Sequence, residues 1–153
     1  MVGLPNTRVV PAGWAAHHRP VANSTMTGLC EITGPAGPPD WDTGQATPGE
    51  LLAERVPCRV QQLTGENEAE AAGQDVNARD YLVTLPLHLV PTLTVTDNAP
   101  WVTITGYQPG HEQDGDPHLI GRSLKVLSVQ HGTLLWERDL ICRDDLTNPG
   151  STP

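Results

Sequence analysis

Apolar and polar residues alternate with a period of two along several short stretches of the chain, and this alternation predicts β-strands. The stretches are residues 25–33, 55–63, 79–85 and 101–105. Two more, residues 123–129 and 133–142, are separated only by Gln130, His131 and Gly132, which predicts a hairpin. Because no long helical crossover lies between the strands, the pattern predicts an all-β, mainly antiparallel fold. We expect a small β-barrel or sandwich with long loops and at most one or two short helices.

Proline and glycine mark the segments between these strands. Pro11 suits the first turn of a short helix and Pro20 is expected to end it. Pro57 places its strand at a sheet edge or at a strand start. The sequence then divides into an N-terminal arm at 1–24, a barrel domain at 25–146, and a flexible polar tail at 147–153, with fraying expected from Asp144 onward.

Composition limits the size of the core. The chain has 153 residues, enough for one ordinary domain, and 37% of them are hydrophobic. There is no Phe, and the aromatic residues are four Trp and two Tyr. Valine, leucine and isoleucine must therefore build most of a small core.

Neither a membrane span nor a signal peptide is expected. No stretch approaches the roughly 20 apolar residues that cross a bilayer, and the first residues lack a basic and hydrophobic leader. The three cysteines, Cys30, Cys58 and Cys142, are odd in number, lie in alternating segments and have no Cys-x-x-Cys spacing. We expect reduced, buried thiols in a protein made in a cytoplasm.

The net charge of −9 is concentrated in the middle of the chain. Residues 66–118 carry nine acidic side chains and one Arg, whereas the segments on either side are nearly balanced. Nucleic-acid binders neutralise phosphate with Lys and Arg, so the acidic balance argues against adhesive contact with nucleic acid.

The densest group of possible metal ligands lies in the loop from Gly106 to Gly121. It contains His111, Glu112, Asp114, Asp116 and His118. Their spacing matches no calcium loop and no zinc motif, so a solvated loop is the preferred interpretation and a metal site the alternative. The adjacent His17 and His18 are interpreted as surface or interface histidines.

Residues 34–49 are rich in Pro and Gly and predict a long, mobile loop without regular structure. Asp40, Trp41 and Asp42 lie in its middle. An aromatic side chain at a loop tip can anchor a protein partner, and the alternative is that Trp41 folds back on its own barrel. We expect this loop to reach a neighbour or the lumen of a channel.

Recognisable catalytic machinery is missing from the sequence. There is no Gly-x-Ser-x-Gly elbow and no phosphate-binding loop, and cysteines inside strands are expected to be inert. The prediction is a protein that is not an enzyme and has no cofactor, no metal ion and no catalytic residues.

Several segments together resemble a family of phage proteins. They are Cys58-Arg59-Val60, the acidic stretch at 66–73, the strand at 81–86, and the run at 116–126 that leads into the last hairpin. Over residues 25–146 the chain resembles the small head–tail connector proteins, also called head-completion or stopper proteins of the neck, of long-tailed phages. The resemblance is particularly to the type found in phages and prophages of actinobacteria.

This resemblance implies a structural virion protein, assembled in the cytoplasm of the bacterial host. Its expected partners are the portal or adaptor ring, the tail-terminator or tail-tube proteins, and further copies of itself in a ring of six or twelve. The ring would close the filled head and form the attachment site for the tail, in passing contact with packaged DNA and without a membrane. The family pattern has no catalytic residues, and the long loop at 106–121 departs from its commonest members.

Two other functions remain open. A tail terminator or another tail ring protein would share the β-rich composition and the ring. An oligonucleotide-binding barrel would need a basic, aromatic strand face, whereas the predicted strands carry scattered Arg and few aromatic residues. Without long apolar repeats, the isolated chain is expected to be a monomer or a weak oligomer.

Overall fold

The computed structural model describes residues 10, 12–35, 37–45, 47, 49–63, 78–95, 99–133 and 135–145. Within these ranges the chain forms one α-helix, two short 3-10 helices and six strands. The elements are α1 (Trp14–Asn23), β1 (Gly28–Thr33), β2 (Leu51–Gln62), β3 (Ala78–Pro86), η1 (Leu87–Leu89), β4 (Trp101–Tyr107), η2 (Pro117–Leu119), β5 (Ser123–Val129) and β6 (Glu137–Asp145).

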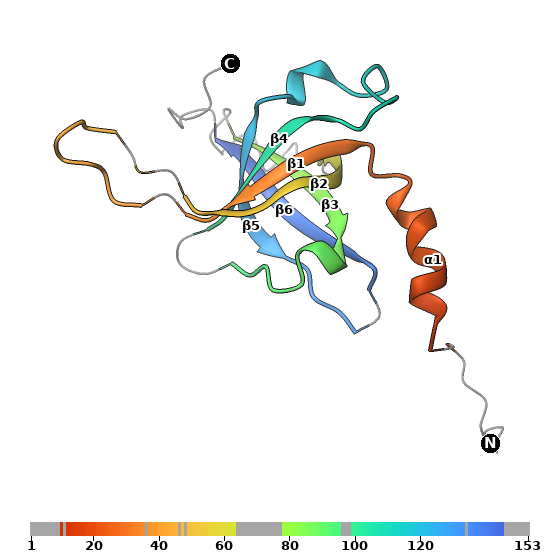
Figure 1. Ribbon diagram of the computed structural model, residues 1–153. Coiled ribbons are helices and arrows are strands. Elements are labelled where there is room, and N and C mark those ends of the chain that lie inside the picture. Colours follow the sequence, from red (N-terminus) through yellow and green to blue (C-terminus); the bar gives the residue numbers. More distant parts are fainter. Residues whose placement is uncertain are drawn as a thin grey trace, which may run out of the picture.

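All six strands pair antiparallel and close into a barrel in the order β1-β2-β3-β6-β5-β4 (Figure 1). This confirms the predicted all-β, mainly antiparallel fold with short helices. Closure depends on β1, which pairs with β2 along one edge and with β4 along the other. Each strand of the closed barrel therefore has a neighbour on both sides over at least part of its length.

The barrel is filled by the alternate residues that the period-two pattern predicts to share one face. Val, Leu and Ile dominate this core, together with the three cysteines and Tyr81. On β6 the inward positions are Arg138, Leu140, Cys142 and Asp144, of which the first and last are charged residues near the two ends of the barrel.

A bulge in β2 bends this strand where it leaves the barrel. Cys30 pairs with Val56 and Ile32 pairs with Ala53, so the intervening residue of β1 faces two residues of β2. One of these two, Arg55, has a φ of 51°, a left-handed conformation that is uncommon outside Gly. The extra residue shifts the inward-facing alternation of β2 and increases the local twist.

Pro57 lies inside β2 and not at a strand start, but the expected edge position is confirmed locally. Pro57 pairs with Leu29 of β1, while the pairing of β2 with β3 begins only at Arg59. Pro57 therefore lies where β2 has a neighbour on one side only, so its missing N–H is tolerated.

Two predicted boundaries near the end of the chain need correction. The hairpin of β5 and β6 is confirmed, but β6 begins at Glu137, so the connection is longer than the three residues expected. Fraying from Asp144 is also wrong, since β6 runs to Asp145 and pairs with β3 over its whole length. The tail at 147–153 and the acidic stretch at 66–73 lie outside the described residues.

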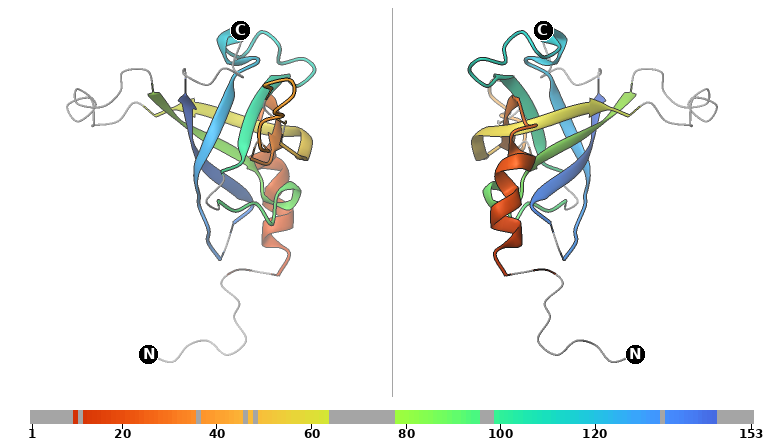
Figure 2. Two further views of the ribbon diagram at one scale, coloured as in Figure 1. Left: turned by 90° about the vertical axis from the view of Figure 1, so that its left-hand side faces the viewer. Right: turned by 90° about the vertical axis from the view of Figure 1, so that its right-hand side faces the viewer.

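The predicted short helix exists, but Pro20 lies inside α1 and does not end it. The helix ends at Asn23, where the Ser24 hydroxyl donates to the Val21 carbonyl at 2.6 Å. Figure 2 shows α1 along one side of the barrel. Arg59 of β2 donates to the hydroxyl of Thr25 and so ties the end of the helix to the wall. In the described part of the chain, no helix is both long and apolar enough to cross a membrane.

Candidate functional site

The segment between β1 and β2 forms a projecting hairpin, which we call the finger (residues 34–50). It extends from one side of the barrel in Figure 1. Its two sides are joined by backbone hydrogen bonds from Gly34 to Glu50 at 2.7 Å, from Gly37 to Thr47 at 3.0 Å, and from Asp40 to Gln45 at 2.9 Å. The described part of this segment is thus a paired structure, and the prediction of a loop without regular structure is wrong there.

The finger is paired despite its prolines because glycine lets its two sides approach closely. A Cβ atom at Gly49 would overlap the carbonyl oxygen of Gly34, and one at Gly37 would lie 3.2 Å from the Cβ of Thr47. The Thr47 hydroxyl also donates across the finger to the Pro38 carbonyl at 2.9 Å. Proline removes N–H donors along this segment, and the remaining ladder bonds use glycine and aspartate donors.

Asp40 closes the tip of the finger. Its backbone carbonyl accepts from Gly44, which has a φ of 70°, and its carboxylate accepts from the Asp42 amide at 2.9 Å. These hydrogen bonds, first to Asp42 and then to Thr43, lower the pKa of the Asp40 carboxyl group. The tip thus has a defined turn and carries a stabilised negative charge.

Trp41 lies at this tip with 91% of its surface exposed. The alternative that Trp41 folds back on its own barrel is therefore wrong. A large aromatic side chain in water, held between two aspartates on a paired hairpin, is well placed to bind a protein surface.

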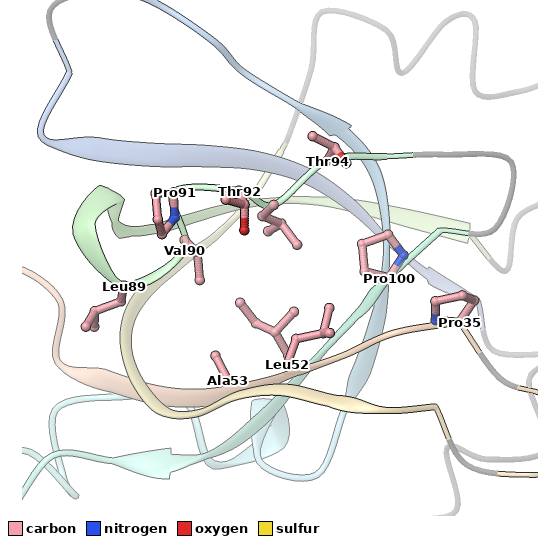
Figure 3. A pocket seen from close by; sticks show the side chains of 11 residues that line it. Pro35, Leu52, Ala53, Leu89, Val90, Pro91, Thr92, Thr94 and Pro100 are labelled. Carbon is pink, nitrogen blue, oxygen red and sulfur yellow. The ribbon is translucent and has the colours of Figure 1, made fainter.

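An apolar cavity of about 340 Å³ lies beside the root of the finger (Figure 3). Leu52 and Ala53 of β2 form one wall, and the segment around Val90 and Pro91 forms the other. No charged side chain lines the cavity. Sequence reasoning missed this cavity because its walls come from segments about 40 residues apart.

The second candidate loop, residues 106–121, follows β4 and is held against the barrel. The Tyr107 hydroxyl donates to the Asp116 carbonyl at 2.5 Å, and the Tyr107 ring packs against Gly115. Arg122 then donates to the His118 carbonyl at 2.7 Å. These contacts fold the loop onto the barrel, so it lacks the reach of the finger.

The acidic and histidine side chains of this loop serve local hydrogen bonds. His111 Nδ1 lies 2.7 Å from the carboxylate of Asp114, and Glu112 accepts from the Gly110 amide at 2.9 Å. The Asp116 carboxylate accepts from the His118 amide at 2.9 Å and so caps η2. Among the residues that the structure describes, no three His, Cys, Asp or Glu side chains converge as a metal site.

The three cysteines are free thiols and completely buried, as the strand pattern predicts. Contact with Cys58 and burial raise the pKa of Cys30, and burial raises the pKa of Cys142 to about 12. Because the thiolate is the reactive form, these shifts disfavour reaction at Cys30 and Cys142, and all three cysteines pack in the core.

An aromatic cluster on the far side of the barrel was not predicted. Trp14 of α1 packs on Trp136, with ring centroids 4.9 Å apart, and on His18 at 4.5 Å. His17 lies edge-on to His18 at 5.1 Å. The spacing of Trp14, His17, His18 and Val21 on one stripe of a helix was visible in the sequence. The contact of Trp14 with Trp136, more than a hundred residues away, was not.

Comparison with known proteins gives a family without a described function. No curated protein and no solved structure matches the chain. Residues 18–143, from within α1 to within β6, match a family of unknown function, DUF6093. Since this match spans most of the chain and nearly the whole barrel, the protein belongs to the DUF6093 family.

Proposed function

We propose that the chain is a structural subunit of the phage neck, where it forms a ring at the head–tail interface. In this role the barrel holds the subunit in the ring, and the finger makes the contact that joins it to a neighbour. The ring closes the filled head and provides the attachment site for the tail. The observation that carries the proposal is the finger itself, a paired projection that exposes Trp41 in water.

An exposed tryptophan keeps a large apolar surface in contact with water, which is unfavourable unless a partner buries it. Burying an aromatic side chain against a partner is one of the largest gains available to an interface, and tryptophan is enriched at such positions. The paired finger holds its tip in one conformation, which reduces the entropy lost on binding. These two properties are those of a docking element.

The charge of the chain supports a ring through which DNA passes. With nine more acidic than basic side chains, its surface repels phosphate and does not retain it. The same balance disfavours an oligonucleotide-binding barrel. We propose a structural role with no enzymatic activity.

The first experiment locates the protein in particles. Antibody-labelled virions, imaged by negative-stain electron microscopy, are expected to carry the label between head and tail. A label on isolated tails but not on filled heads would replace the neck assignment with that of a tail terminator. A preparation of virions without the protein would contradict the proposal.

The second experiment tests the finger in the phage that encodes the chain. Replacing Asp40-Trp41-Asp42 with Gly-Ser-Gly should leave the barrel's melting temperature nearly unchanged, because the side chain of Trp41 makes almost no contact in the free subunit. The expected particles leak DNA or fail to join tails. The matched control is Gln113→Ser, an exposed position of the other loop, which should give normal particles. Normal particles from the finger variant would move the proposed role to the loop at 106–121.

A further inference from the structure

The finger and α1 lie on opposite sides of the barrel, and their chemistry is complementary (Figure 1). We propose that the finger tip of one copy docks on the outer face of α1 in the next copy. This inference rests on the proposed ring and names the contact that builds it. A finger cannot reach the helix of its own chain across the barrel, so the contact must join two copies.

The donor side of this contact is acidic and aromatic. Trp41 is exposed between Asp40 and Asp42, and the turn that holds them is fixed by the hydrogen bonds of Asp40. The tip therefore presents one large ring flanked by two negative charges.

The acceptor side is the stripe of α1 formed by Trp14, His17, His18 and Val21. These residues follow one another at the i, i+3, i+4 and i+7 spacing, which places them on one side of the helix. None of them is buried, and Val21 is 69% exposed. Trp14 and His18 are half-buried, with Trp14 packed on Trp136, whereas His17 and Val21 are exposed and form the open part of the stripe.

Charge favours the acidic tip as the occupant of the stripe. The sequence of α1, WAAHHRPVAN, contains no acidic residue, and Arg19, next to the stripe, gives it one positive charge, while the rings of His17 and His18 offer N–H donors to a carboxylate. Rings of Trp14 and Trp136 lie beside these groups and offer an aromatic surface for Trp41. The cavity at the finger root is a poorer acceptor, because no charged side chain lines it and Glu50 and Glu54 flank its β2 residues in sequence.

The geometry also defines the symmetry of the assembly. Tip and helix are different surfaces, so each copy uses one as donor and the other as acceptor. Such head-to-tail contacts repeat until the ring closes. A two-fold dimer, in which both copies use the same surface, is a different arrangement and gives a different result in the test below.

Two variants of the full chain each remove one side of the contact, either the finger tip or the helix stripe. The tip variant carries Asp40→Gly, Trp41→Ser and Asp42→Gly, and it keeps the helix stripe. The helix variant carries His17→Glu and Val21→Glu, two exposed positions one turn apart, and it keeps the finger. Ala16→Gln, an exposed position off the stripe, is the matched control. Circular dichroism and melting temperatures confirm that each variant keeps the fold.

Sedimentation velocity over a concentration series then measures association. The wild-type chain and the control are expected to form species larger than dimers as concentration rises. Each variant alone should associate at least about tenfold more weakly, as expected for loss of an aromatic anchor. An equimolar mixture of the two should form a dimer that stops at two chains, because only one intact tip and one intact helix remain to pair.

A photo-cross-linking residue at position 41 identifies the acceptor directly. The expected cross-links join position 41 to peptides that contain residues 14–23 of a second chain. Cross-links to residues 52 and 91 at the cavity instead, a mixture that forms no dimer, or unchanged association of the tip variant would overturn the inference. So would a wild-type chain that stays monomeric and gives no cross-link to the helix.

This test is independent of the particle experiments. It uses purified chains, so a virion label at the neck together with a failed cross-link would leave the ring in place and assign it to other surfaces. A tip-to-helix cross-link together with unlabelled virions would leave the contact in place and reject the neck.

Discussion

Arg122 and Asp144 form an ion pair at one end of the barrel, where Arg122 Nη1 donates to the Asp144 carboxylate. Asp144 is the last inward-facing residue described on β6 and is only 1% exposed. Arg122 also holds the carbonyl of His118 at 2.7 Å. The pair thus links the folded loop at 106–121 to the last strand.

Arg122→Ala should destabilise the protein by about 3 kcal/mol, because it leaves a buried carboxylate without its counter-ion. Urea unfolding followed by circular dichroism measures this loss. Adding Asp144→Asn to the same chain removes the stranded charge and should recover part of the stability. A single variant as stable as wild type would show that water already solvates Asp144.

Gly49→Ala should disrupt the finger and spare the barrel, since its Cβ would overlap the Gly34 carbonyl oxygen. The expected local cost is about 1–3 kcal/mol, the usual range for overpacking. Faster amide exchange at Gly34 and Gly37 measures it, because their N–H groups are ladder donors. Gly106→Ala is the control, because a Cβ there meets no atom within 4 Å. Equal exchange in both variants would contradict the close approach.

Tyr107→Phe tests how the loop at 106–121 is held. The substitution removes the hydrogen bond from Tyr107 to the Asp116 carbonyl and keeps the ring against Gly115. We expect a loss of about 1 kcal/mol in the free energy of unfolding. Faster proteolysis within the loop should accompany this loss, and an unchanged cleavage rate would mean that ring packing alone fixes the loop.

The buried thiols predict a loss of stability at alkaline pH. Burial raises the pKa of Cys142 from 9.0 to about 12, so the unfolded chain ionises this thiol at lower pH than the folded chain. The contribution of the buried, neutral Cys142 thiol to the free energy of unfolding is complete below pH 9.0 and is lost as the pH rises to about 12. The expected slope from Cys142 is about 1.4 kcal/mol per pH unit. Denaturant titrations at several pH values should show a shallower slope for Cys142→Val, and identical slopes would contradict the assignment.

The barrel was predictable because most of its strands bury one face, so the alternation of apolar residues is visible locally. The cysteines followed from the same rule, since Cys30, Cys58 and Cys142 occupy inward positions. Applied one step further, the rule places Asp144 inward with Leu140 and Cys142. An acidic residue near the end of a predicted strand is normally exposed, so the alternation alone does not predict that Asp144 is buried.

The finger and the aromatic cluster depend on contacts that local patterns do not contain. Proline and glycine between residues 34 and 49 predict irregular structure, and the pairing of Gly34 with Glu50 overrides that preference. The continuation of α1 past Pro20 is likewise supported by the Ser24 hydrogen bond and by the hydrogen bond from Arg59 to Thr25. In both cases, tertiary contacts and turn geometry decide the structure.

The position of β6 in the sheet sets the order in which the barrel can be completed during synthesis. Although β6 is the last strand in the chain, it lies between β3 and β5. Until residues 137–145 have left the ribosome, β3 and β5 each lack a neighbour, and the wall stays open along that seam. Its pairing with β3 spans more than fifty residues, a separation typical of slow folding. The hairpin of β1 and β2, with the finger at its end, is local and can form earlier. A nascent chain would thus present the exposed Trp41 before its barrel is closed.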